Sequence, residues 1–188
     1  AVADGKVVFG GCDAILHIHD VVTGKEIKQV EVGNYIGNNA AIASNIAYVT
    51  HYGNRVGAYD LTTGTMVWEY GEREFEYYAA VALHEKYVVA GGRDKRIHGI
   101  DRATGKGLWE FRCKDRIDSS PLICAGKTVI VGSDDGFVYA LNLEDGKEMW
   151  KYEIGAPVRT SAAVAGEQVI FGADDGVVYA FKNAAAAE

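Results

Sequence analysis

Two histidines on one short segment are the residues whose spacing most directly suggests chemistry. His17 and His19 alternate with apolar residues, so on an extended strand both imidazoles face the same side. Two neighbouring imidazoles can bind a transition metal. A solvated or packed pair explains the same spacing, and His51, His84 and His98 are scattered along the chain. We therefore expect no metal site.

The other reactive residue types form no catalytic pattern. The three cysteines, Cys12, Cys113 and Cys124, are an odd number and contain no Cys-x-x-Cys pair. No Ser/His/Asp or Cys/His arrangement stands out, and no glycine-rich loop precedes a predicted helix. We expect three free thiols and no nucleophilic site.

Composition narrows the class of protein. The 188 residues are 48% hydrophobic and 24% charged, which is typical of a packed globular chain. The net charge of -7 argues against nucleic acid as a partner, because phosphate binding requires a basic surface. No run of 18 apolar residues is present, so no membrane-spanning helix is expected, and no signal-peptide pattern is visible.

An internal repeat of about 40 residues must position any functional side chain. Acidic or amide residues recur at spacings of 41, 40, 41 and 40, namely Asp13, Asn54, Asp94, Asp135 and Asp175. Turn pairs recur at the same period, namely Thr23-Gly24, Thr63-Gly64, Thr104-Gly105 and Asp145-Gly146. A repeat of this length with alternating apolar residues predicts the four-stranded blades of a β-propeller.

The copy at 125–165 shows how each unit divides. We predict strands at 128–132, 137–142 and 148–153, and a strand of small residues at 160–165 that becomes the innermost strand of the next blade. The chain then contains three strands, three blades of four strands, and three more strands, with no helix. The fold class is all-β, with about 4.5 antiparallel blades in one domain, 1–183. The repeats are expected at about 4–43, 44–82, 83–124 and 125–165, with a partial copy at 166–183 and a tail at 184–188.

Three positions of each repeat are expected to be structural. The Asp or Asn accepts hydrogen bonds from the turn, and the Gly takes the left-handed conformation. The Trp covers the gap between adjacent blades while its indole N–H binds a carbonyl. These docking residues are Asp60, Gly64 and Trp68; Asp101, Gly105 and Trp109; and Asn142, Gly146 and Trp150. The first repeat has Lys28 at the Trp position.

These residues resemble a known repeat. The pattern Ala58-x-Asp60-x-x-Thr63-Gly64-x-x-x-Trp68 is similar to the tryptophan-docking motif of quinoprotein (PQQ-like) propeller repeats. The resemblance extends from residue 1 to about 182. It implies one of several roles: a dehydrogenase that holds pyrroloquinoline quinone and Ca²⁺, a binding scaffold such as the outer-membrane assembly lipoprotein that binds the β-barrel insertion machinery, or an extracytoplasmic sensor domain of a signalling protein.

The resemblance favours the scaffold. Dehydrogenases of this family typically carry an adjacent Cys-Cys pair, which this chain lacks. We therefore expect no cofactor, no enzymatic activity, a protein partner, and a location in the periplasm or cell envelope. The alternatives are a fragment of a PQQ-dependent dehydrogenase and a ligand-sensing domain.

Loops that enter the innermost strands surround the mouth of a propeller's central channel, and they vary between copies. Aligning the repeats places Gly37, Glu76, Asp118 and Arg159 at one position, and Asn38, Tyr77, Ser119 and Thr160 at the next. We expect a charged ring from the first set and an aromatic patch from Phe75, Tyr77 and Tyr78. The alternative is a hydrated channel lining together with a tyrosine contact between blades. The funnel candidates are Asn38, Glu76, Tyr77, Tyr78, Asp118 and Arg159.

The number of repeats does not close a ring of the family's usual size. Propellers have about four to eight blades, and the resemblance implies seven or eight. We therefore expect that the chain is part of a longer protein or that partner chains supply the missing blades.

Overall fold

Residues 1–71 and 73–182 are described by a computed structural model, and they form an all-β structure. The first sheet contains β1 (Val2–Ala3), β2 (Lys6–Gly10), β3 (Ile15–Asp20) and β4 (Glu26–Glu31). The second contains β5 (Ala41–Ala43), β6 (Ile46–His51), β7 (Arg55–Asp60) and β8 (Met66–Tyr70). The third contains β9 (Ala82–Leu83), β10 (Tyr87–Gly91), β11 (Arg96–Asp101) and β12 (Gly107–Arg112). The fourth contains β13 (Leu122–Cys124), β14 (Thr128–Gly132), β15 (Phe137–Asn142) and β16 (Glu148–Glu153), and the fifth β17 (Ala163–Ala165), β18 (Gln168–Gly172) and β19 (Val178–Lys182).

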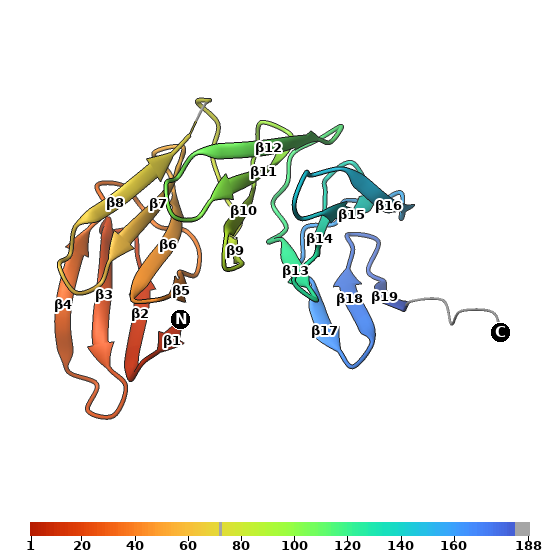
Figure 1. The fold of residues 1–188 in the computed structure, drawn as a ribbon. Helices are drawn as coiled ribbons and strands as arrows, with labels where there is room; N and C mark the ends of the chain where they lie inside the picture. The colour runs from red at the N-terminus through yellow and green to blue at the C-terminus, as the bar shows by residue number, and fades with distance from the viewer. Residues whose placement is uncertain (72, 183–188) are drawn as a thin grey trace.

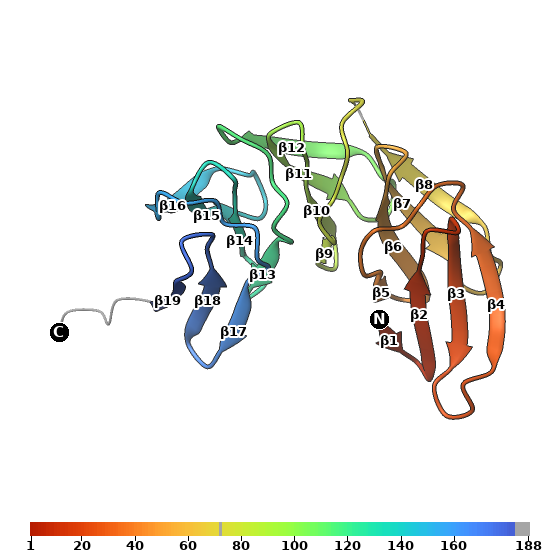
Figure 2. The ribbon, with the colours of Figure 1, turned by 180° about the vertical axis from the view of Figure 1, so that it is seen from behind.

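The five sheets are propeller blades arranged side by side around an open arc (Figure 1). Every sheet runs antiparallel in chain order, with its short first strand innermost, and the first strands of the first four sheets contact their neighbours. The view from behind shows the same gap between the first and fifth sheets (Figure 2). The structure confirms the predicted fold class, and no helix occurs among the described residues.

Burial follows from the stacking of sheets on one another. The third strands of the second, third and fourth sheets are buried at four successive positions, because a neighbouring sheet covers each face. In β3 the burial alternates instead, with Leu16 and Ile18 inside and His17 and His19 on the uncovered face. Four apolar cores lie between successive sheets and hold the arc together.

Two details of the predicted repeat were wrong. The first sheet has four strands, not three, because Val2 and Ala3 pair with Val7 and Lys6. Asn54 does not occupy the position of the recurring aspartates, because its φ of 64° matches Ala14 (64°) and Lys95 (67°), which follow those aspartates. Gly53 therefore stands at the aspartate position of the second sheet.

The other strand predictions agree with the structure, with one shortened strand. The small-residue strand after β16 pairs with β18, so it belongs to the next sheet as predicted. It begins only at Ala163, because the Thr160 hydroxyl accepts a hydrogen bond from the Gly172 N–H and donates one to the Gly172 carbonyl. The predicted tail at 184–188 lies outside the described residues. All three cysteines are free thiols.

The docking prediction is confirmed for two tryptophans. The indole N–H groups of Trp68 and Trp109 donate to the carbonyls of Arg102 and Leu143 in the following sheet, both at 2.9 Å. Lys28 makes the equivalent bond through Nζ, to the Thr62 carbonyl. Trp150 meets Phe181 edge-on, with ring centroids 5.3 Å apart, and is 40% exposed.

The three turns that receive Lys28, Trp68 and Trp109 are built alike. The Asp60 carboxylate accepts hydrogen bonds from the backbone N–H groups of Thr62 and Thr63, and Asn142 accepts one from the N–H of Glu144. Asp101 binds both the N–H and the hydroxyl of Thr104. The glycines of these turns have φ values of 79°, 73° and 69° at Gly64, Gly105 and Gly146. The sequence therefore encodes the contacts between neighbouring sheets in its turns.

A rim of paired charges and tyrosines

One edge of the arc combines the loops between sheets with the hairpin turns after each second strand. In each case a backbone N–H of the hairpin donates to a carbonyl of the loop. The pairs are Tyr52 to Tyr35, Arg93 to Glu76, Asp134 to Arg116, and Asp174 to Pro157. These bonds hold each loop on the hairpin that follows it, so they fix the backbone from which the side chains of this edge project.

The same bonds correct the alignment of the rim. Tyr35, Glu76, Arg116 and Pro157 accept equivalent bonds, and the next residue is buried in each case. Two places further on stand Gly37, Tyr78, Asp118 and Arg159, so Tyr78 occupies the position predicted for Glu76. Asp118 and Arg159 each lie nine positions after the preceding tryptophan, whereas Glu76 lies eight and Tyr78 ten positions after Trp68. The loop after β8 contains one extra residue.

Arg93 forms the first part of a series of ion pairs. Its Nε and one terminal nitrogen bind the two oxygens of Asp118 at 2.9 and 3.0 Å, and its other terminal nitrogen lies 3.2 Å from Glu76 Oε2. A two-point Arg–carboxylate pair fixes both side chains in direction as well as distance. The Arg93 side chain is 25% exposed and that of Asp118 is 13% exposed, so the pair is only partly screened by solvent.

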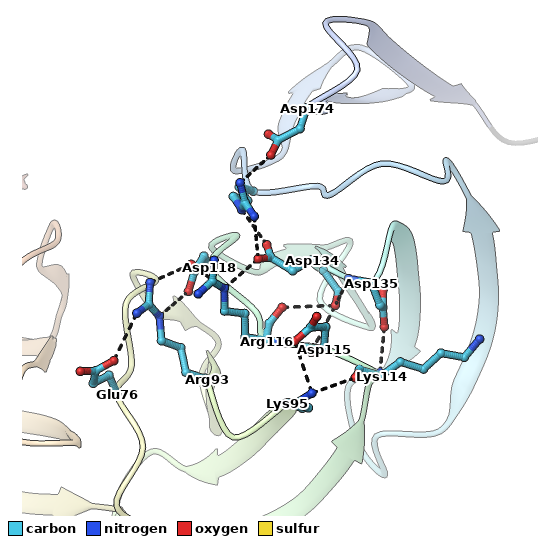
Figure 3. Close-up of polar contacts among 12 residues, drawn as sticks. Glu76, Arg93, Lys95, Lys114, Asp115, Arg116, Asp118, Asp134, Asp135 and Asp174 are labelled. Atoms are coloured by element: carbon cyan, nitrogen blue, oxygen red, sulfur yellow. Dashed lines mark hydrogen bonds and ion pairs between the residues drawn. The ribbon is translucent and has the colours of Figure 1, made fainter.

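The series continues across the fourth and fifth sheets. Arg159 binds both oxygens of Asp134 at 2.9 and 3.0 Å and reaches Asp174 at 2.6 Å. Arg116 Nε lies 2.7 Å from Asp134 and 3.5 Å from Asp118, which joins the two halves (Figure 3). Charges of opposite sign therefore alternate from Glu76 to Asp174.

Asp134 is the most deeply placed carboxylate of this series, with its side chain 5% exposed. Burial alone raises the pKa of this group, but the hydrogen bonds and positive charges of Arg159 and Arg116 outweigh burial and hold the pKa below 3.8. The same bonds, chiefly the one to Asp134, raise the pKa of Arg159. Asp134 and Arg159 therefore remain an ionised pair around neutral pH.

Tyrosines continue the rim over the first two sheets. The Arg93 guanidinium lies 3.7 Å from the ring centroid of Tyr78, and the Tyr52 hydroxyl donates to the Tyr78 hydroxyl at 2.8 Å. Tyr35 and Tyr52 are 55% and 41% exposed. We call Tyr35, Tyr52, Tyr78 and Arg93 the rim patch.

Three of the predicted site residues belong to the charged series. Glu76, Asp118 and Arg159 lie in one charged series, but they are linked only through Arg93, Arg116 and Asp134. The sequence contains a signal for two of these missed residues, because Arg93 and Asp134 share one hairpin position with Tyr52 and Asp174.

The aromatic patch was predicted incorrectly. Tyr77 is 5% exposed and packs edge-on against His98 in the core, with ring centroids 5.5 Å apart. It therefore forms no surface patch with Phe75, which is 52% exposed. Asn38 lines a shallow hollow of about 270 Å³ at the rim, together with Gly37 and Asn39.

Comparison with known proteins agrees with this architecture. A family model described as outer membrane protein assembly factor BamB matches residues 1–112 and 93–187. BamB from Moraxella catarrhalis superposes with a TM-score of 0.87 at 17% identity, over 97% of this chain and 60% of that one. No curated protein sequence matches significantly.

Two computationally designed proteins have similar structures. Ika8 superposes with a TM-score of 0.84 at 22% identity, over 97% of this chain and 57% of its own. Ika4 superposes with a TM-score of 0.71 at 20% identity, over 80% of this chain and 92% of its own. At these identities the likeness concerns the fold. The chain spans about 60% of the length of the BamB structure. No helix in the described part of the chain could span a membrane.

Proposed function

The chain belongs to the family whose model is described as outer membrane protein assembly factor BamB, and on this basis we propose that it is a non-catalytic scaffold that binds a protein partner through the rim. The observation that carries the proposal is the rim patch. Tyrosine and arginine are the residue types that most often dominate the energy of protein–protein interfaces.

The rim patch is also ordered before any partner arrives. Tyr52 and Tyr78 are joined through their hydroxyls, and Arg93 is held by Asp118 while it lies over the Tyr78 ring. Ordering a flexible side chain on binding costs about 0.5–1.5 kcal/mol. A patch whose side chains are already fixed avoids much of that cost, which favours recognition of a protein surface.

The charge state of the rim supports binding rather than acid–base chemistry. A general acid or base works best when its pKa lies near the working pH. Asp134 is held ionised by two arginines instead. Alternating fixed charges select partners of complementary charge pattern and disfavour others.

We further propose that the partner is a component of outer-membrane protein assembly and that the chain works in the cell envelope. The support is the description of the matched family together with the propeller fold. A partner that offers an aromatic or aliphatic side chain to Tyr35 and Tyr52, flanked by polar groups for the charge series, fits this surface.

Site-specific photo-crosslinking tests the proposal. The purified chain carries a photoreactive phenylalanine in place of Tyr52 and is irradiated with detergent-solubilised outer-membrane proteins. The matched control carries it in place of Val22, which is 88% exposed in the turn after β3, at the opposite edge of the arc. We expect one dominant product from position 52 and none from position 22.

Competition measures the contribution of the patch. Unlabelled wild-type chain displaces the crosslink, whereas the Arg93→Ala variant requires about 30-fold more protein, the equivalent of a 2 kcal/mol hot spot. Equal products from both positions, or equal competition by the variant, would contradict rim binding. Oxidation of alcohols or sugars by the chain with pyrroloquinoline quinone and Ca²⁺ would contradict the non-catalytic role.

A further inference from the structure

The uncovered face of the first sheet gathers two imidazoles and a carboxylate. His17 and His19 project from β3 on the same side, as the sequence predicted, and Glu26 on β4 lies beside them. One ligand atom of each of the three lies within 4.8 Å of the others. Glu26 Oε2 lies 3.2 Å from His17 Nδ1 and 3.7 Å from His19 Nε2.

His19 departs from what the repeat requires at its position. In each sheet this residue pairs with the second residue of the preceding strand. The other four sheets have a large apolar or aromatic residue there, namely Tyr59, Ile100, Leu141 and Phe181. The first three are at most 2% exposed. The fold alone therefore does not account for a histidine at this position.

Each imidazole has a hydrogen-bond acceptor on the side away from Glu26. The Asp13 carboxylate lies 2.7 Å from His17 Nε2, and the Gly24 carbonyl lies 3.0 Å from His19 Nδ1. Both partners are acceptors, so each neutral ring can carry its proton on that side and turn the lone pair of His17 Nδ1 or His19 Nε2 toward Glu26. Gln29 Nε2 donates to both carboxylate oxygens of Glu26, at 3.1 and 3.0 Å, and holds the carboxylate beside the two rings.

The two separations from Glu26 suit a metal ion. Zn²⁺ binds imidazole nitrogen and carboxylate oxygen at about 2.0–2.2 Å, so ligands of a tetrahedral site lie about 3.4 Å apart. The two contacts of Glu26 with the histidines, at 3.2 and 3.7 Å, bracket this value. Phe9 stacks on His17 and lies against His19, with ring centroids 5.2 and 5.4 Å apart, which limits the rotation of both imidazoles.

We propose that His17 Nδ1, His19 Nε2 and Glu26 form a binding site for a divalent transition-metal ion of the Zn²⁺ type. Asp13 and the Gly24 carbonyl orient the two imidazoles, in the manner in which carboxylates and carbonyls support metal-binding histidines. With three ligands from the chain, the ion keeps a coordination position for water or for a group of another molecule.

The third sheet provides an internal comparison. His98 also pairs with the aspartate four residues before it, Asp94, at 3.2 Å. Its other nitrogen lies 3.1 Å from the Tyr70 hydroxyl of the preceding sheet, and its neighbour two residues on is Ile100 rather than a second histidine. An Asp–His pair at these positions therefore occurs in two of the sheets, whereas the second histidine occurs in the first sheet and not in the third.

Zinc titration of the purified, metal-free chain tests the proposal. Isothermal calorimetry measures affinity and stoichiometry, and Co²⁺ replaces Zn²⁺ as a probe whose visible absorption reports on the ligands. The variants are His19→Ile, which introduces a residue that the third sheet carries at this position, and Glu26→Gln, which changes one exposed carboxylate. Glu31→Gln on the same strand is the matched control, and circular dichroism checks that each variant is folded.

We expect saturation near one ion per chain, binding at least tenfold weaker in His19→Ile and in Glu26→Gln, and unchanged affinity in Glu31→Gln. Asp13→Asn should weaken binding by about 10–100-fold, because it releases the orientation of His17. Absence of saturable binding would overturn the proposal. So would binding that survives unchanged in a folded Glu26→Gln variant.

Discussion

Replacing Gly146 by alanine should destabilise the protein far more than the same change at Gly24. The two glycines occupy equivalent turns, with φ values of 69° and 68°, and each donates its N–H to the residue four places earlier at 2.9 Å. They differ in what lies next to them. A Cβ at position 146 would lie 2.4 Å from Trp109 Cε3, whereas a Cβ at position 24 would meet nothing within 4 Å.

The expected magnitudes follow from these differences. A non-glycine residue in the left-handed region costs about 1–2 kcal/mol, partly offset by about 0.4–1 kcal/mol because alanine restricts the unfolded chain. Gly24→Ala should therefore lower the free energy of unfolding by about 1 kcal/mol. Gly146→Ala adds an overpacking cost of about 1–3 kcal/mol. If the indole shifts, its hydrogen bond to Leu143 is lost as well, at about 0.5–1.5 kcal/mol. The difference between the two variants should be about 3 kcal/mol.

Urea denaturation followed by tryptophan fluorescence and by circular dichroism measures both variants. Gly105→Ala should behave like Gly146→Ala, because its Cβ would lie 2.7 Å from the Trp68 ring. Gly64→Ala should stay close to Gly24→Ala, because its neighbour is the flexible Lys28 side chain at 3.5 Å. Values for Gly24→Ala and Gly146→Ala within about 0.5 kcal/mol of each other, no more than the usual scatter of surface substitutions, would refute the docking argument.

Three further predictions concern the rim and the thiols. Asp134→Asn should lower the free energy of unfolding by about 1–3 kcal/mol, because a nearly buried carboxylate and its arginine partners lose their pairing. Asp174→Asn should lower it by less than about 1 kcal/mol, because the Asp174 side chain is 41% exposed. Because the pKa of Asp134 is lower in the folded protein, its ionised carboxylate stabilises the fold fully above about pH 4, and this stabilisation is lost as the pH falls through the folded-state pKa. Urea denaturation of the wild type and Asp134→Asn between pH 2 and pH 7 should show the two free energies of unfolding converging only at the acid end. Ellman's reagent should modify the exposed Cys12 rapidly and Cys113 only on unfolding, because Cys113 is 3% exposed and burial raises its pKa. Rapid modification of Cys113 in the folded chain would contradict its burial.

The rim shows where alignment of the repeats was insufficient. Alignment of the repeats placed Glu76 with Asp118, whereas the structure places Tyr78, two residues further on, in that position. The register of a loop is set by where its backbone is bonded, here by the bond from Arg93 N–H to the Glu76 carbonyl. A residue count does not contain that information, and the burial of Tyr77 follows from the same shift.

The amino-acid sequence by itself determined the blade, its turns and the contacts of Trp68 and Trp109. The blade and its turns depend on alternation along a strand and on hydrogen bonds between residues a few positions apart. The tryptophan contacts join equivalent positions of successive repeats, 34 residues apart, so they recur with the repeat. Only the tertiary structure decided that Arg116 meets Asp134 and that Glu26 meets the two histidines. Those side chains come from different strands or loops, and a shift of one residue changes which of them face each other.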